Sequence, residues 1–174
     1  VMLKAGVAYA VRVEYWDRRA DASIQLIWSP PATNLREEAL AAAKSADVVV
    51  MMMGLSPRLE GEEMPVEVPG FKGGDRVALG LPRVQEELIQ AVVAIGKPVV
   101  LVLLNGSAVA VNWEAEHIPA IVEAWYPGQA AGTALADVLF GNYNPAGRLP
   151  VTFYKSADQI PPFSNYTMEG KTYR

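Results

Sequence analysis

The chain contains no cysteine and only one histidine, His117, in 174 residues. Without cysteine it can form neither a disulfide bond nor a thiolate metal site. A single histidine cannot build the histidine cluster that many metal centres use. Because His117 precedes Ile118-Pro119, we interpret it as a residue of a loop or of a last helical turn, in preference to a catalytic base.

Long apolar runs and basic clusters are missing as well. No run approaches the ~18–20 apolar residues that span a bilayer, so we predict no membrane partner. The net charge is −4 with no cluster of lysine or arginine, which argues against a nucleic-acid partner. With 51% hydrophobic and 20% charged residues, the composition is that of a folded chain with one sizeable core. The chain opens at Val1 without a signal segment, and we interpret it as a fragment or a processed chain.

The common phosphate-binding motifs and the serine-nucleophile motif are also absent. Neither G-x-G-x-x-G nor a P-loop follows an apolar run, which removes the usual phosphate-binding sites. No G-x-S-x-G elbow is present, and we interpret Ser107 in NGSAV as a turn residue. The sequence therefore predicts no cofactor.

The first 33 residues have an all-β pattern. Apolar and polar side chains alternate over Tyr9–Trp16 and again over Ser23–Trp28, which predicts two antiparallel strands. Because two strands are not stable alone, we predict that residues 1–33 are the last hairpin of a β-sandwich whose other strands lie outside this chain.

From Asn34 onward the pattern changes to α/β. Near-continuous apolar runs alternate with amphipathic helical patterns, which predicts a mostly parallel sheet with helices on both faces. Leu81, Val84, Leu88, Val92 and Ile95 recur at helical spacing and are predicted to face the core. The predicted strands are Val48–Met53, Val99–Leu104 and Ala120–Trp125, with an edge strand at Val151–Tyr154, and the predicted helices begin at Asn34 and cover Leu81–Ile95, Trp113–Glu116 and Gln129–Phe140.

The longest connection, from Gly54 to the helix that starts at Leu81, is rich in carboxylates. It contains Glu60, Glu62, Glu63 and Glu67 and ends near Asp75-Arg76, which we interpret as an ion pair. Connections longer than ~12–15 residues are usually functional or disordered, and ligands of open α/β sheets lie beyond the carboxyl ends of the strands. The loop is therefore either a solvated acidic surface or a site of carboxylate chemistry such as glycoside hydrolysis, which needs one ionised and one protonated carboxyl group.

Several ordered segments resemble the C-terminal α/β sandwich domain of glycoside hydrolase family 3. The resemblance covers about residues 34–174, and the strands before it resemble the end of a protective-antigen-type β-sandwich insert at residues 1–33. The segments that carry it are GLSPRLEGEE, GGDRVALGLPRVQEELI, KPVVLVLLNGSAVAVNW, EAWYPGQAAGTALADVLFGNYNPAGRLPVTF and YTMEGKTYR.

The resemblance implies a retaining exo-acting β-glycosidase that removes glucose or xylose from a β-linked oligosaccharide or glycoside. The nucleophile of such enzymes lies on an upstream (β/α) barrel domain, and their general acid/base is a glutamate on a loop of the sandwich domain. That position best matches Glu60, with Glu62 and Glu63 as alternates because the added MPVEVPGFKG shifts the alignment. The long loop and the insert resemble a bacterial subgroup, which favours β-xylosidase activity and a periplasmic or secreted location.

Two other classes of function stay open on the sequence. One is a carbohydrate-binding or regulatory module without catalysis, and the other is a structural or oligomerisation domain. The sequence does not decide between glucose and xylose, and it leaves the oligomeric state, a homo-oligomer included, open.

Overall fold

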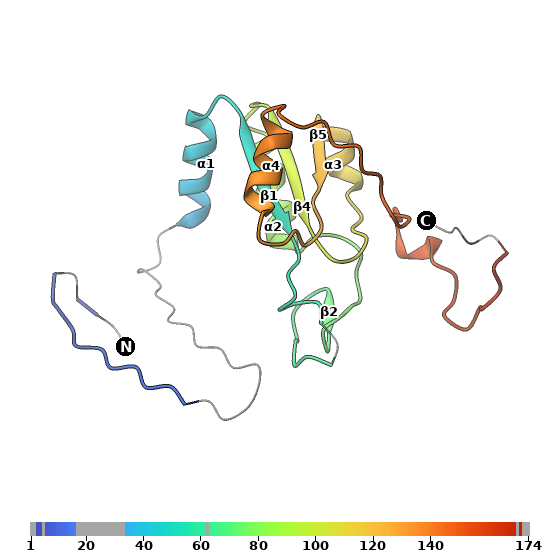
Figure 1. Ribbon diagram of the computed structural model, residues 1–174, viewed down its shortest axis with the longest axis horizontal. Helices are drawn as coiled ribbons and strands as arrows, with labels where there is room; N and C mark the ends of the chain where they lie inside the picture. The colour runs from blue at the N-terminus through green and yellow to red at the C-terminus, as the bar shows by residue number, and fades with distance from the viewer. Residues whose placement is uncertain (1–2, 5, 17–33, 62, 170, 172–174) are drawn as a thin grey trace. The chain divides into compact units, whose positions relative to one another are not determined.

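The computed structural model describes residues 3–4, 6–16, 34–61, 63–169 and 171 (Figure 1). The chain divides into two compact units, Val1–Asn34 and Leu35–Arg174. The second unit carries all the helices and strands of the described residues, so the fold and the candidate site are those of this unit.

A three-stranded parallel sheet forms the centre of this unit. The strands are β1 (Val49–Gly54), β4 (Val99–Leu104) and β5 (Ala120–Glu123), in the order β1-β4-β5. Both β1 and β5 pair parallel with β4, with Val49 opposite Val99 and Val100 opposite Ala120, so all three strands run in the same direction. The three predicted strands and their parallel pairing are confirmed, and the central strand β4 is covered on both faces, whereas Val50 and Met52 of the edge strand β1 are exposed.

Helices lie on both sides of the sheet, as predicted. In Figure 1, α2 lies behind the strands and α4 lies in front of them. The α2 helix contacts both β1 and α1, whereas none of the residues of α4 is buried. The helices are α1 (Leu35–Ser45), α2 (Arg83–Val93), α3 (Asn112–His117) and α4 (Ala131–Leu139), with a short 3₁₀ turn η1 (Ala157–Gln159).

The inward face of α2 and its flanks is largely the predicted one: Leu81 and Val92 are buried, and Leu88 and Ile95 pack against the core. Ile89 is completely buried and Val92 is 3% exposed, whereas Val84, predicted to face the core, is 71% exposed. The apolar spacing therefore gave the inward side, but it included the exposed Val84 and left out Ile89. The core that this helix covers consists mainly of sheet residues, Leu101 and Leu103 among them.

Two predicted strands are not formed. Residues 6–16 belong to no sheet, and the apolar side chains of this segment, such as Tyr9 and Val11, are exposed. The predicted partner strand Ser23–Trp28 lies outside the described residues. An alternating pattern forms a strand only where a neighbouring strand completes its hydrogen bonds, and residues 6–16 have no such neighbour among the described residues. Val151–Tyr154 is likewise irregular, with Phe153 packed edge-on against Trp125.

The long loop contains a small hairpin that the sequence analysis missed. Strands β2 (Phe71–Lys72) and β3 (Asp75–Arg76) pair antiparallel around Gly73-Gly74, a dipeptide typical of tight hairpin turns. This is the antiparallel element of the described residues, in place of the N-terminal pair that was predicted. Among the described residues, no helix has the length and apolar character needed to cross a membrane.

Candidate active site

The carboxylate-bearing loop leaves the sheet at Gly54, the last residue of β1. The side chain of Gln85 on α2 accepts a hydrogen bond from the Gly54 N–H and donates one to the Gly54 carbonyl, both at 2.8 Å. Gly54 has a φ of 140°, and a Cβ at this position would lie 2.0 Å from the Leu104 carbonyl oxygen. The sequence therefore needs glycine here, and the exit direction of the loop is fixed at the carboxyl end of the sheet.

Glu60 lies where the loop crosses the ends of the other two strands. Its Oε1 accepts hydrogen bonds from the Gly106 N–H and from the Tyr126 hydroxyl, both at 2.9 Å. Its Oε2 accepts one from the Ser107 hydroxyl at 3.0 Å. Gly106 and Ser107 follow β4, and Tyr126 follows β5, so this one carboxylate joins the loop to both strand ends.

Arg76 holds the far end of the loop at the same place. Its guanidinium donates to the Ser107 hydroxyl oxygen at 2.9 Å and to the carbonyl of Leu79 at 2.6 Å. Burial lowers the pKa of Arg76, and the nearby Glu60 carboxylate opposes this shift. Asp75 is exposed and makes no ion pair with Arg76, so the predicted Asp75–Arg76 pair is wrong: the arginine binds carbonyl groups and Ser107 instead.

The Tyr126 hydroxyl responds to the same carboxylate. Its pKa is raised, first by partial burial and then by its hydrogen bond to Glu60 and the charge of that group. Tyr126 is therefore a donor to Glu60 throughout the neutral range, because a raised pKa keeps the phenol protonated.

A second carboxylate, Glu123, lies at the end of β5. It accepts hydrogen bonds from the Trp125 N–H at 3.0 Å and from the Asn105 side chain at 3.3 Å. Burial raises the pKa of Glu123, and these two hydrogen bonds oppose the shift. Asn105 is completely buried, and its Oδ1 has no hydrogen-bond partner.

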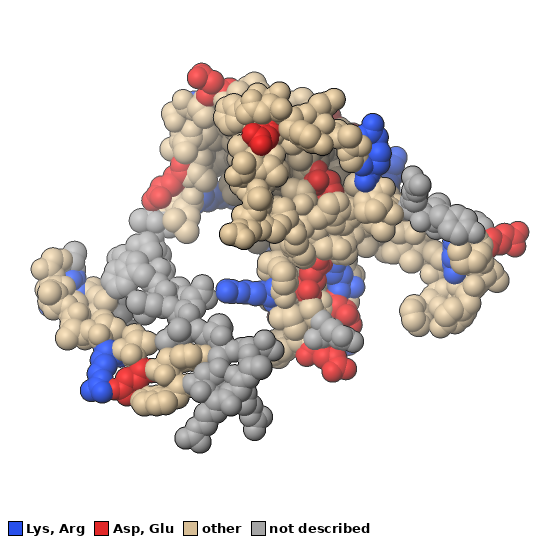
Figure 2. All heavy atoms as spheres, viewed as in Figure 1, with Lys and Arg blue, Asp and Glu red and all other residues tan. Residues whose placement is uncertain are grey.

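An open polar hollow of about 360 Å³ lies over this network. It is lined by residues of the loop and of the turn after β4, among them Glu60, Arg76 and Ser107. Figure 2 shows that Asp and Glu side chains gather over the part of the molecule that carries β2. No group of three or more histidine, aspartate or glutamate side chains in the described ranges is arranged to hold a metal ion.

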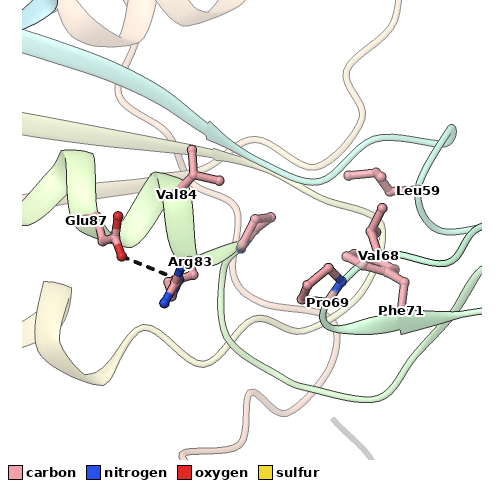
Figure 3. A pocket seen from close by; sticks show the side chains of 8 residues that line it. Leu59, Val68, Pro69, Phe71, Arg83, Val84 and Glu87 are labelled. Atoms are coloured by element: carbon pink, nitrogen blue, oxygen red, sulfur yellow. Dashed lines mark ion pairs between the residues drawn. The ribbon is translucent and has the colours of Figure 1, made fainter.

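A larger and mostly apolar pocket of about 660 Å³ lies on another side of the same loop (Figure 3). The loop supplies Leu59, Val68 and Phe71, and the first turns of α2 supply Arg83 and Glu87, which form an ion pair at 3.4 Å. Because no carboxylate of the loop lines this pocket, the polar hollow is the better candidate for catalysis.

The predicted site residues differ in how the structure holds them. Glu60 is joined to the ends of two strands, whereas Glu63 is exposed and has a left-handed backbone with a φ of 50°. Glu62 lies outside the described residues. Sequence reasoning missed Tyr126 and read Ser107 as a turn residue only. Both lie just beyond the carboxyl ends of predicted parallel strands, where ligands of open α/β sheets bind, and that rule could have found them.

His117 was predicted to be a structural residue. It is the last residue of α3, exposed, and stacked on Trp113 with ring centroids 4.2 Å apart. Its Nδ1 lies 2.8 Å from the Trp113 carbonyl oxygen. The predicted place in a last helical turn is therefore confirmed.

Comparison with known proteins identifies the family of this domain. The model of the glycosyl hydrolase family 3 C-terminal domain matches residues 4–174. A xylan 1,4-beta-xylosidase of Xylanibacter ruminicola is 54% identical over 138 residues, which are 79% of this chain and 16% of that protein. A periplasmic beta-glucosidase of Salmonella typhimurium is 42% identical over 137 residues, which are 79% of this chain and 17% of that protein.

Solved structures give the same result. The crystal structure of a GH3 beta-glucosidase of Bifidobacterium adolescentis has a TM-score of 0.66 and 39% identity, covering 82% of this chain and 20% of that one. A beta-glucosidase of Erythrobacter marinus has a TM-score of 0.66 and 40% identity, covering 74% of this chain and 17% of that one. The chain thus spans 16% to 20% of the length of these relatives. With the family model matched from residue 4 to residue 174, the chain belongs to glycosyl hydrolase family 3 and carries its C-terminal domain.

Proposed function

We propose that this chain is part of a retaining, exo-acting β-glycosidase and supplies the general acid/base loop to an active site shared with a (β/α) barrel domain. The observation that carries this proposal is the long glutamate-bearing loop, which is held at the carboxyl ends of β4 and β5 beside an open polar hollow. A loop fixed at that edge can reach into the pocket of another domain, and the nucleophile would come from that domain.

The proposed substrate is a β-linked xyloside or glucoside, with xyloside preferred. The 54% identical relative is named a xylan 1,4-beta-xylosidase, and the 42% identical one a beta-glucosidase. The name of the second relative also supports a periplasmic or secreted location. The proposal that residues 1–33 end a β-sandwich insert rests on their alternating sequence alone.

In this proposal, one glutamate of residues 59–63, the LEGEE segment, protonates the departing oxygen and then deprotonates the attacking water. The sequence names Glu60 first, with Glu62 and Glu63 as alternates. Glutamine at the acid/base position keeps the shape and removes the proton, which costs on the order of 10²–10⁴-fold in rate.

The test is azide rescue of Glu60→Gln, Glu62→Gln and Glu63→Gln in the complete enzyme. A substrate with a good leaving group, such as a dinitrophenyl glycoside, needs little protonation, so its covalent intermediate accumulates in the variant that lacks the base. Azide attacks that intermediate without a base, and we expect it to restore turnover of one variant and to yield a β-glycosyl azide. If azide rescues none of the three, this loop is not the source of the acid/base.

A further inference from the structure

The described contacts of Glu60 are those of an anchored carboxylate. Three donors, the Gly106 N–H, the Ser107 hydroxyl and the Tyr126 hydroxyl, point at its two oxygens. Donors are the partners of the ionised form of a carboxyl group. A general acid must instead hold a proton and present it to the substrate.

Arg76 orients one of these donors. Because the Ser107 oxygen accepts a hydrogen bond from Arg76, the hydroxyl proton of Ser107 is left to point at Glu60. The same guanidinium binds the carbonyl of Ala108, so Glu60 near the start of the loop and Arg76 near its end meet on one turn. Two side chains that are 16 positions apart thereby close the loop onto the end of β4.

Close backbone packing reinforces this closure. A Cβ on Gly74 would lie 1.8 Å from the Gly61 carbonyl oxygen, so the residue after Glu60 lies directly against the hairpin that carries Arg76. A Cβ on Gly106 would lie 2.8 Å from both Glu60 Oε1 and the Tyr126 ring. The space around the carboxylate is therefore filled by protein atoms on the side of the strand ends.

From this network we propose that Glu60 is a positioning residue. It holds the LEGEE segment on the ends of β4 and β5, so that a following glutamate of the same segment acts as the acid/base. The inference rests on the proposed function, because it concerns the loop that supplies the proton. It replaces the sequence-based choice of Glu60 as the acid/base with a supporting role for that residue.

The first test compares leaving groups and pH in the complete enzyme. A positioning role predicts that Glu60→Gln lowers kcat for good and poor leaving groups by a similar factor, on the order of 10- to 100-fold, since small misplacements cost about that much. Azide restores nothing, and the basic limb of the pH–rate profile is kept. The matched control is Glu67→Gln, an exposed glutamate of the same loop, which should leave kcat unchanged.

The second test is a double-mutant cycle with Tyr126→Phe. Tyr126 is 39% exposed, so the loss of its hydroxyl leaves folding intact. If both residues act through one hydrogen bond, Tyr126→Phe lowers kcat when it is the only substitution. In the Glu60→Gln background it lowers kcat little further. Tyr143→Phe, at an exposed tyrosine outside the network, serves as the control.

The outcomes separate the two proposals. Azide rescue of Glu62→Gln or Glu63→Gln, with a uniform loss in Glu60→Gln, supports both. Azide rescue of Glu60→Gln overturns the positioning role and leaves the proposed function standing. If no variant is rescued, the proposed function fails, and the cycle still decides the inference: additive losses for Glu60→Gln and Tyr126→Phe overturn it. A wild-type kcat in Glu60→Gln overturns it as well.

Discussion

At the scale of single residues, the ionisation of Glu123 at the end of β5 makes the stability of the folded state depend on pH. Its carboxylate is half-buried, and its pKa is raised mainly by that burial. A carboxyl group with a higher pKa in the folded chain binds its proton more tightly there than in the unfolded chain. The folded state therefore loses stability as pH rises from the ordinary pKa of 4.5 through the raised value.

We predict that Glu123→Gln removes this loss. The free energy of unfolding of the wild type should fall relative to that of the variant as pH is raised from about 4 to about 8, because only the wild type must ionise a half-buried group. Urea unfolding at several pH values measures the difference. Glu67→Gln, the same substitution at an exposed loop position, is the control, and a pH-independent difference for Glu123→Gln would contradict the prediction.

There is no room for a side chain at Gly106, which lies next to the Glu60 carboxylate. We predict that Gly106→Ala displaces Glu60 and Tyr126, because its Cβ would lie 2.8 Å from an atom of each. Such overpacking typically costs about 1–3 kcal/mol, measured by urea unfolding, and kcat of the complete enzyme should fall with it. Gly128→Ala is the control, since a Cβ there meets no atom within 4 Å. Equal stability of the two variants would count against the tight packing at Gly106.

At this scale, the sequence indicated candidate residues but not their partners. The functional carboxylate on the loop was predicted from the length of the loop and its glutamates, and it stays a prediction. The sequence could not predict that Tyr126 reaches Glu60, 66 positions earlier in the chain, because that contact depends on which strand ends lie together. The misread Asp75–Arg76 pair has the same cause: neighbours in sequence are not always partners, and Arg76 found buried carbonyls instead.

At the scale of elements, helix α2 determines how well the sheet is covered. We predict that Ile89→Ala costs about 2–5 kcal/mol of unfolding free energy, because the side chain is completely buried and leaves a cavity. Val84→Ala on the same helix, at a position that is 71% exposed, should change it by less than about 0.5 kcal/mol. Thermal or urea unfolding measures both variants, and a larger loss at Val84 than at Ile89 would contradict this prediction.

The elements that the sequence predicted well are those with one clear signal. The three apolar runs became the three parallel strands because Gly and Pro residues bound them and no alternation opposes burial. The β2–β3 hairpin was missed because two-residue strands carry too few residues for a pattern. On α2 the predicted face was right at Leu88 and Val92 and wrong at Val84, because an apolar side chain in the first turn of a helix can stay exposed although its spacing fits.

At the scale of the whole molecule, the chain holds one part of the proposed active site. We predict that the purified 174-residue chain hydrolyses no aryl β-glycoside, because a retaining mechanism needs a nucleophile about 5–5.5 Å from the acid/base, and the proposed nucleophile belongs to the barrel domain. The measurement is release of a nitrophenol, with the complete enzyme as the positive control. Robust turnover that persists through a further purification step would overturn the shared-site proposal.

The end of β1 has a consequence for self-association. In the described sheet, β1 lies at one edge, and exposed strand edges are templates on which other chains can add a strand. The backbone N–H groups of Val49 and Leu55 donate hydrogen bonds on the β4 side. The N–H and the carbonyl of Gly54 are instead hydrogen-bonded to the side-chain amide of Gln85. This amide occupies the place that a peptide group of an added strand would need, so any strand joining this edge must stop before Gly54. Strand addition from another molecule is thereby kept away from the point where the carboxylate loop begins.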